Sequence, residues 1–148
     1  MLISNRNAAD IIHRHGATAC TDVTGFGLVG HLVEMLTAGQ TSAMLLLDRL
    51  TILQGAIDCT SKDLLSSLHA HNLANEIHLT NSHNYSNHNH YPLLFDPQTS
   101  GGLLAILPAK NAPSCLQQLQ QYGYAMAAEI GIIDGSLSAE NIGRIQVT

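Results

Sequence analysis

The residue types best suited to chemistry lie in a glycine-rich turn near the start of the chain. Asp22 stands near the end of segment 17–23, whose alternating pattern predicts a short strand, and Thr24-Gly25-Phe26-Gly27 follows. A helix over 27–39 is expected next, because its apolar residues recur at helical spacing. Glycines let a backbone approach an anion closely, and the first turn of a helix offers free amide groups and a positive dipole end.

A carboxylate beside such a turn would repel phosphate unless a cation lay between the two. Magnesium is the natural cation, since it binds hard oxygens and often bridges a protein carboxylate and a nucleotide phosphate. The loop therefore indicates a magnesium-assisted phosphate site that includes Asp22. A plainer interpretation stays open on the motif alone, in which Asp22 caps the helix and the glycines only form a turn.

A second turn-rich loop lies at Phe95-Asp96-Pro97-Gln98-Thr99-Ser100-Gly101-Gly102. Pro97 fixes a turn, Thr99 and Ser100 carry hydroxyl donors, and the paired glycines permit close backbone approach ahead of a strand. An anion pocket is one use of such a loop. A connecting turn capped by Asp96 is the other.

The remaining pattern predicts helices over 5–15 and 111–124, a short helix or turn over 51–61, and strands over 41–50, 102–109, 125–134 and 141–148. Ser4 and Gly16 should bound the first helix, and Gly123 should end the later one. The last two strands are expected to pair as a hairpin across Asp134-Gly135. Helices and strands mix without strict alternation, which is typical of an α+β or layered α/β domain.

Segment 61–91 differs in character, because it holds six of the nine histidines together with many Asn and Ser residues. It is expected to be a long His/Asn-rich surface excursion. His83, His88 and His90 could bind nickel or zinc through their imidazoles. They lack a rigid metal-ligand spacing, so a solvated loop is the alternative.

Composition narrows the class of protein. The 148 residues fit a single domain, and the charged fraction of 11% lies far below the usual ~25%, so we expect a missing domain or partner to cover part of the surface. The net charge of −5, without any basic run, argues against nucleic-acid binding. No apolar run approaches the ~20 residues that span a membrane.

The three cysteines, Cys20, Cys59 and Cys115, lack CxxC spacing, which favours free thiols in the cytoplasm. We expect Cys20 to be buried rather than to act as a nucleophile.

The stretches ACTDVTGFGLVGHLVEM and PLLFDPQTSGGLLA together resemble the two signature stretches of the carboxy-terminal domain of selenophosphate synthetases (selenide, water dikinases). That domain type is shared with aminoimidazole ribonucleotide synthetase and its relatives. The match is close over 18–36 and 92–106, looser elsewhere, and leaves out the His/Asn-rich segment. It implies a layered α/β/α sandwich with a mixed β-sheet over residues 1–148.

The resemblance also implies a reaction, in which ATP, selenide and water give selenophosphate, AMP and phosphate. Full-length members of the family resemble a two-domain chain that forms a homodimer. The amino-terminal domain of such members holds the reactive Cys or selenocysteine, a Lys and three Asp ligands for magnesium. That catalytic domain is absent from this sequence. The chain is therefore expected to begin within a longer protein, to hold no catalytic residue and to be inactive alone.

Site residues carry over only where the motifs match. Asp22 corresponds to the family's remaining magnesium ligand, and His31, which matches the GH of the motif, could pack, form hydrogen bonds or contact substrate. The expected nucleotide- or phosphate-binding residues are Thr21, Thr24, Gly25, Gly27, Thr99, Ser100, Gly101 and Gly102. Two alternatives stay open: a stand-alone nucleotide- or anion-binding accessory module without catalysis, and a related purine or hydrogenase-maturation synthetase domain. The GFGLVGH motif argues against the purine or hydrogenase-maturation alternative.

Overall fold

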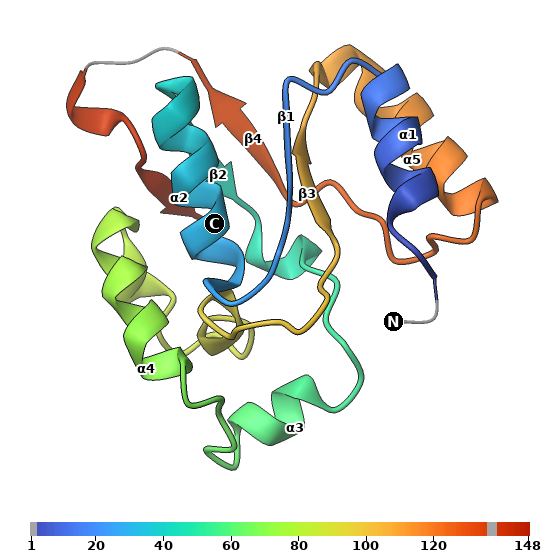
Figure 1. Cartoon of the computed structure of the whole chain (residues 1–148). Helices are drawn as coiled ribbons and strands as arrows, with labels where there is room; N and C mark the ends of the chain where they lie inside the picture. The colour runs from blue at the N-terminus through green and yellow to red at the C-terminus, as the bar shows by residue number, and fades with distance from the viewer. Residues whose placement is uncertain (1–2, 136–138) are drawn as a thin grey trace.

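The computed structural model describes residues 3–135 and 139–148, and Figure 1 shows the whole chain. In chain order its α-helices and strands are α1 (Arg6–Arg14), β1 (Ala19–Asp22), α2 (Gly27–Gly39), β2 (Ser42–Leu45), α3 (Ala56–Thr60), α4 (His69–Asn72), β3 (Leu103–Ile106), α5 (Ala112–Gln121), β4 (Gly131–Asp134) and β5 (Ile145–Val147). Short 3-10 helices are η1 (Leu47–Arg49), η2 (Leu73–His78), η3 (Ser82–Asn84), η4 (Pro92–Leu94), η5 (Ala109–Asn111) and η6 (Ala139–Asn141).

The strands form two small sheets, and helices accompany both. β1 and β3 pair antiparallel, with Asp22 opposite Leu103. In the other sheet β2 lies in the middle, antiparallel to β4 and parallel to β5. The expected α+β class with a mixed sheet is therefore confirmed. Among the described residues, no helix has the length and apolar character needed to cross a membrane.

The hairpin expected across Asp134-Gly135 is wrong. β4 and β5 do not pair with each other, because β2 lies between them (Figure 1). The parallel pairing of β5 with β2 sets Ala43 opposite Ile145, and both Ile145 and Val147 are fully buried. Burial of these two side chains in the core favours this arrangement over the local turn.

Two apolar cores lie on either side of the β1–β3 sheet. The larger core joins α2 to the three-stranded sheet through Val29, Leu36, Leu45 and Ile145, and it includes Leu104 of β3. The smaller core joins α1 to α5, and Leu103 and Ala105 of β3 pack against it. The alternation of β3 side chains between the two cores follows from the two-residue period of a strand. Figure 1 shows α1 beside α5 on one flank and α2 on the other.

Segment 61–91 contains only short helices, and most of its side chains are exposed. Four of its side chains are nevertheless buried: His69, Asn72, Leu79 and Tyr91. Leu79 and Tyr91 belong to the larger core. Nε2 of His69 donates to the carbonyl oxygen of Pro92 at 2.9 Å, since a carbonyl oxygen can only accept, so this nitrogen carries a proton. The segment is thus fastened to the domain at several points.

Candidate functional site

The two signature loops lie side by side because their flanking strands pair. β1 ends at Asp22, and β3 begins opposite it at Leu103. The amide of Val23 donates to the carbonyl of Gly102 at 2.9 Å, which continues the ladder past the strands. The amide of Gln98 donates to the carbonyl of Thr24 at 3.0 Å. We call residues 21–27 loop 1 and residues 96–102 loop 2, and these bonds join them into one surface.

The Asp22 side chain is exposed at the tip of β1. In the described part of the chain its carboxylate has neither a hydrogen-bond donor nor a cationic partner. A free carboxylate offers the hard oxygen ligands that Mg²⁺ prefers. The described residues contain no group of three His, Cys, Asp or Glu side chains arranged to hold a metal ion. By its chemistry, the Asp22 carboxylate is suited to serve as one ligand of a Mg²⁺ ion.

The four glycines predicted for the site divide into two kinds. A Cβ atom on Gly27 would lie 2.9 Å from the carbonyl carbon of Phe95, and its φ of +68° also favours glycine. A Cβ atom on Gly101 would lie 2.2 Å from the carbonyl oxygen of Val23. By contrast, nothing lies within 4 Å of such an atom on Gly25 or Gly102. Gly27 and Gly101 therefore let the loops pack together, while Gly25 and Gly102 face open space.

Unpaired backbone amides accompany this open space. Within the described residues, neither Gly25 nor Phe26 donates its amide to an acceptor, whereas the amide of Gly27 donates to Thr24 at 3.1 Å. These two amides immediately precede α2, where the helix dipole favours an anion. The ring of Phe26 is 54% exposed beside them. In loop 2, Thr99 and Ser100 are exposed, and Ser100 adopts a φ of +56°.

Two buried polar side chains hold loop 1 from behind. The amide of Thr24 donates to Nε2 of His31 at 3.0 Å, and the Thr24 hydroxyl lies 3.1 Å from the same nitrogen. The side-chain amide of Asn72 donates to the carbonyls of Gly25 at 2.8 Å and Phe95 at 3.0 Å. The motif drew attention to His31 without fixing its role, and the structure assigns it a hydrogen-bonding one. Asn72 was not predicted as a site residue, because no local pattern distinguishes it from the other polar residues of segment 61–91.

Cys20 is exposed, so the expectation of a buried thiol is wrong. Among the described residues its strand, β1, pairs on one edge with β3 and has no strand on the other edge. Partial burial, and then the charge of Asp22, raise the pKa of the Cys20 thiol. A raised pKa disfavours the thiolate and argues against a nucleophile. Cys115 is buried between α1 and α5, and burial raises the pKa of its thiol.

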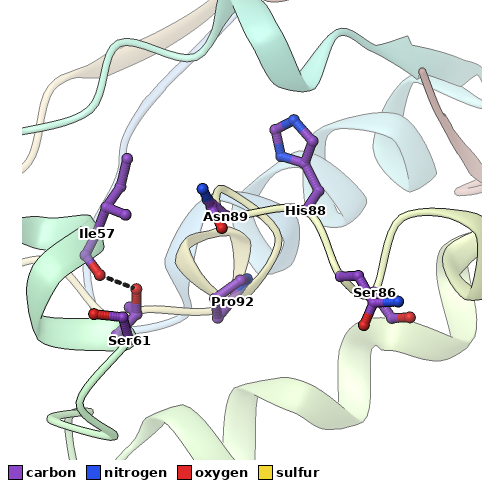
Figure 2. Close-up of a pocket in the computed structure, with 8 residues that line it drawn as sticks. Ile57, Ser61, Ser86, His88, Asn89 and Pro92 are labelled. Atoms are coloured by element: carbon purple, nitrogen blue, oxygen red, sulfur yellow. Dashed lines mark hydrogen bonds between the residues drawn. The ribbon is translucent and has the colours of Figure 1, made fainter.

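A separate cavity of 190 Å³ lies between α3 and the end of segment 61–91, and Figure 2 shows its lining. Its walls include Ile57, Ser61, His88 and Pro92, but no residue of loop 1 or loop 2. Nε2 of His88 lies 3.2 Å from the carboxylate of Asp48. Nδ1 of His90 lies 2.8 Å from the carbonyl oxygen of Leu47. Both rings are thus engaged within the protein, and the nickel or zinc hypothesis gains no support from the described residues.

Comparison with known proteins places the chain in a family. Residues 1–140 match the AIR synthase related protein, C-terminal domain, so the chain belongs to that family. Among curated relatives, the selenide, water dikinase of Carboxydothermus hydrogenoformans is 36% identical over 133 residues, which cover 89% of this chain and 38% of that protein.

Two more proteins named selenide, water dikinase are similar to this chain to a comparable degree. The selenide, water dikinase of Geobacter metallireducens is 34% identical across 90% of this chain and 38% of its own length. That of Pseudomonas straminea is 32% identical across 94% of this chain and 39% of its own length. The predicted resemblance is thereby confirmed. The chain spans about two-fifths of the length of these relatives and corresponds to their carboxy-terminal part.

Proposed function

We propose that this chain is the carboxy-terminal domain of an ATP-dependent selenophosphate synthetase, which converts ATP, selenide and water into selenophosphate, AMP and phosphate. One observation carries the proposal: loop 1, which matches the family's first signature, holds both the Asp22 carboxylate and the Gly25 and Phe26 amides, and none of these groups has a hydrogen-bond partner among the described residues. The relatives bear the name of this activity. In our proposal the chain contributes one wall of the active site and is inactive alone.

In this reaction the domain would position the nucleotide phosphates and neutralise their charge. Phosphoryl transfer depends mainly on alignment and charge neutralisation rather than on covalent work by the protein. A Mg²⁺ ion bound by Asp22 would screen the negative charge of the triphosphate. The amides of Gly25 and Phe26 would donate to phosphate oxygens, and the bare backbone at Gly25 and Gly102 would permit the approach.

The other predicted contacts differ in accessibility. Thr99 and Ser100 are exposed in loop 2, where their hydroxyls are free to reach a nucleotide phosphate. Thr21 lies on β1 next to Asp22, and its hydroxyl is within 3.3 Å of the Asp22 carbonyl. We retain these residues as proposed contacts. Gly27 and Gly101 act instead through the packing of the two loops.

The amino-terminal synthetase domain is the proposed partner, since the curated relatives are more than twice as long as the part matched here. That domain would supply the remaining magnesium ligands and the catalytic residues, and the complete protein would form a homodimer. Exposed apolar side chains offer surface for a partner; Leu64 is 64% exposed and Ile77 is 72% exposed. The three free cysteines fit a cytoplasmic enzyme.

The test is the Asp22→Asn variant in a two-domain enzyme that joins this chain to an amino-terminal dikinase half. Asn keeps the size of the side chain and removes its charge, so AMP release should fall at least ~100-fold, as when one key electrostatic contact is lost. Asp10→Asn is the matched control, because Asp10 is an exposed aspartate on α1 and belongs to neither loop. Near-normal AMP release by Asp22→Asn would refute the proposed role.

A stand-alone anion-binding module is the competing function. It would bind ATP or phosphate without an amino-terminal domain, whereas our proposal requires ligands from that domain. Isothermal titration of this chain with Mg²⁺ and ATP separates the two. The purine and hydrogenase-maturation alternative receives less support, because the relatives described above are named selenide, water dikinase.

A further inference from the structure

We propose that His31 is a positioning residue for loop 1: as a neutral ring with its proton on Nδ1, it fixes the backbone that presents the Gly25 and Phe26 amides. The significance of those amides rests on the proposed function. The hydrogen bond itself does not, and it can be tested without any nucleotide.

The hydrogen bonds of His31 define its protonation state. Its side chain lies on α2 and is 6% exposed, and its Nε2 accepts the Thr24 amide at 3.0 Å. A backbone N–H can only donate, so Nε2 must present a lone pair. A neutral imidazole has one proton, which must then lie on Nδ1.

Nδ1 of His31 is buried. This nitrogen has no hydrogen-bond partner among the residues that the structure describes. A carboxylate oxygen of Glu34, one turn along α2, lies 3.5 Å away. That contact satisfies the distance of an ion pair but not the geometry of a hydrogen bond. The nearby negative charge still favours a proton on Nδ1 over a bare lone pair.

The hydrogen bond between Thr24 and His31 restrains the backbone of loop 1. Thr24 donates its amide to His31, while its carbonyl accepts from Gln98 at 3.0 Å and from Gly27 at 3.1 Å. The peptide groups on both sides of Thr24 are therefore held. The carbonyl of Gly25 is held in turn by Asn72. Between these fixed points the amides of Gly25 and Phe26 have no acceptor among the described residues.

Packing around the ring supports the same role. The rings of Phe26 and His31 lie 5.5 Å apart, centre to centre. A Cβ atom on Gly30 would come within 2.8 Å of the Phe26 Cβ, so the turn folds closely onto α2. Donors that are fixed before an anion arrives need no reorganisation when it binds. His31 thereby supplies preorganisation without touching the ligand.

The role also changes the expectation for Thr24. Its hydroxyl lies 3.1 Å from the Nε2 that already accepts the Thr24 amide, and the residue is half-buried. The side chain is thus engaged with His31 rather than directed at a phosphate. Thr24 acts in this proposal as a loop former, and the phosphate contacts pass to the two free amides.

The experiment uses this chain without ligand and compares His31→Gln with His31→Leu. A Gln side chain can present its Oε1 as an acceptor in place of Nε2, whereas Leu has no acceptor. Two-dimensional ¹⁵N–¹H NMR of the wild type should show the Nδ1–H tautomer of His31. Exchange of the Thr24 amide, normalised to core amides of α2, should quicken about 10-fold in His31→Leu and stay within about 3-fold in His31→Gln. The normalisation removes any general loss of stability.

His69→Gln is the matched control, because His69 is another buried histidine and does not contact Thr24. It should leave the normalised exchange of Thr24 unchanged. An Nε2–H tautomer of His31, or equal Thr24 exchange in the wild type and His31→Leu, would overturn the proposal.

A second measurement connects the bond to activity. In the two-domain enzyme, His31→Leu should reduce kcat/KM for ATP about 10-fold, and His31→Gln should restore most of it. Equal losses in both variants would contradict the positioning role. If Asp22→Asn fails to reduce AMP release while the Thr24 amide is protected as described, the proposed function falls and the His31 bond stands. If Asp22 is essential and Thr24 is unprotected, the reverse holds.

Discussion

The side-chain amide of Asn72 donates to the carbonyl of Gly25 at 2.8 Å and to the carbonyl of Phe95 at 3.0 Å, so one nitrogen fastens two segments that are far apart in the sequence. An amide NH₂ group has two protons, one for each bond. Asn72 is only 2% exposed. A residue of the His/Asn-rich segment thus holds loop 1 against the segment that leads into loop 2.

We predict that Asn72→Leu lowers the free energy of unfolding by about 2–4 kcal/mol. The substitution leaves the buried carbonyl of Phe95 and the half-buried carbonyl of Gly25 without their donor, and each lost partner costs about 1–3 kcal/mol. Urea denaturation followed by circular dichroism measures the change. Asn75→Leu is the control, because Asn75 makes a single bond, to the Asn72 carbonyl at 3.2 Å, and is half-buried. Its expected cost is about 1 kcal/mol or less, and equal losses would contradict the assigned role of Asn72.

We predict opposite outcomes for alanine at two neighbouring glycines of loop 2. In Gly101→Ala the new methyl group would lie 2.2 Å from the Val23 carbonyl oxygen, which belongs to the backbone and cannot move aside independently. Overpacking of this kind costs about 1–3 kcal/mol, and a backbone clash belongs at the upper end. In Gly102→Ala the methyl group meets nothing within 4 Å.

The measurement is the change in the free energy of unfolding of each variant relative to the wild type, obtained from the shift in its thermal midpoint. Gly102→Ala should stay within about 0.5 kcal/mol of the wild type, as surface substitutions usually do. Gly101→Ala should be clearly less stable. Similar stabilities for both variants would show that Gly101 does not approach Val23 as closely as the structure has it.

Local elements were predictable where the local sequence decides them. The helix expected over 27–39 is α2, Gly27–Gly39, because apolar residues at helical spacing and flanking glycines mark it from both sides. Gly16 and Gly123 follow α1 and α5 with φ values of +80° and +92°, as expected for glycines that end helices. The prediction of a hairpin between the last two strands was wrong, because both β4 and β5 pair with β2 instead. That pairing depends on the burial of residues far apart in the sequence, which leaves no local pattern.

The candidate site was predictable only as a set of residues. The motif identified Asp22 and the glycines, but their sequence could not separate Gly27 and Gly101, which the packing of the loops requires, from Gly25 and Gly102, which face open space. That division depends on contacts between segments about 70 residues apart. The same holds for the partner of His31 and for Asn72. The residue type of Asn72 does not reveal that its side chain donates to loop carbonyls, because any exposed Asn would look the same in the sequence.

The hydroxyl of Tyr91 donates to the Glu76 carboxylate. Burial, and then this bond, raise the pKa of Tyr91 to about 12 from the ordinary value of 10.0. Between these two pH values the unfolded chain loses the proton and the folded chain keeps it, so the stability present below pH ~10 declines as pH rises towards ~12, at most ~1.4 kcal/mol per pH unit. Tyr91→Phe removes this contribution and leaves the other three tyrosines as they are. Unfolding free energies of both proteins from pH 9 to 12 should therefore converge, because the wild type loses more. Parallel pH profiles would show that Tyr91 ionises as readily in the folded chain as in the unfolded one.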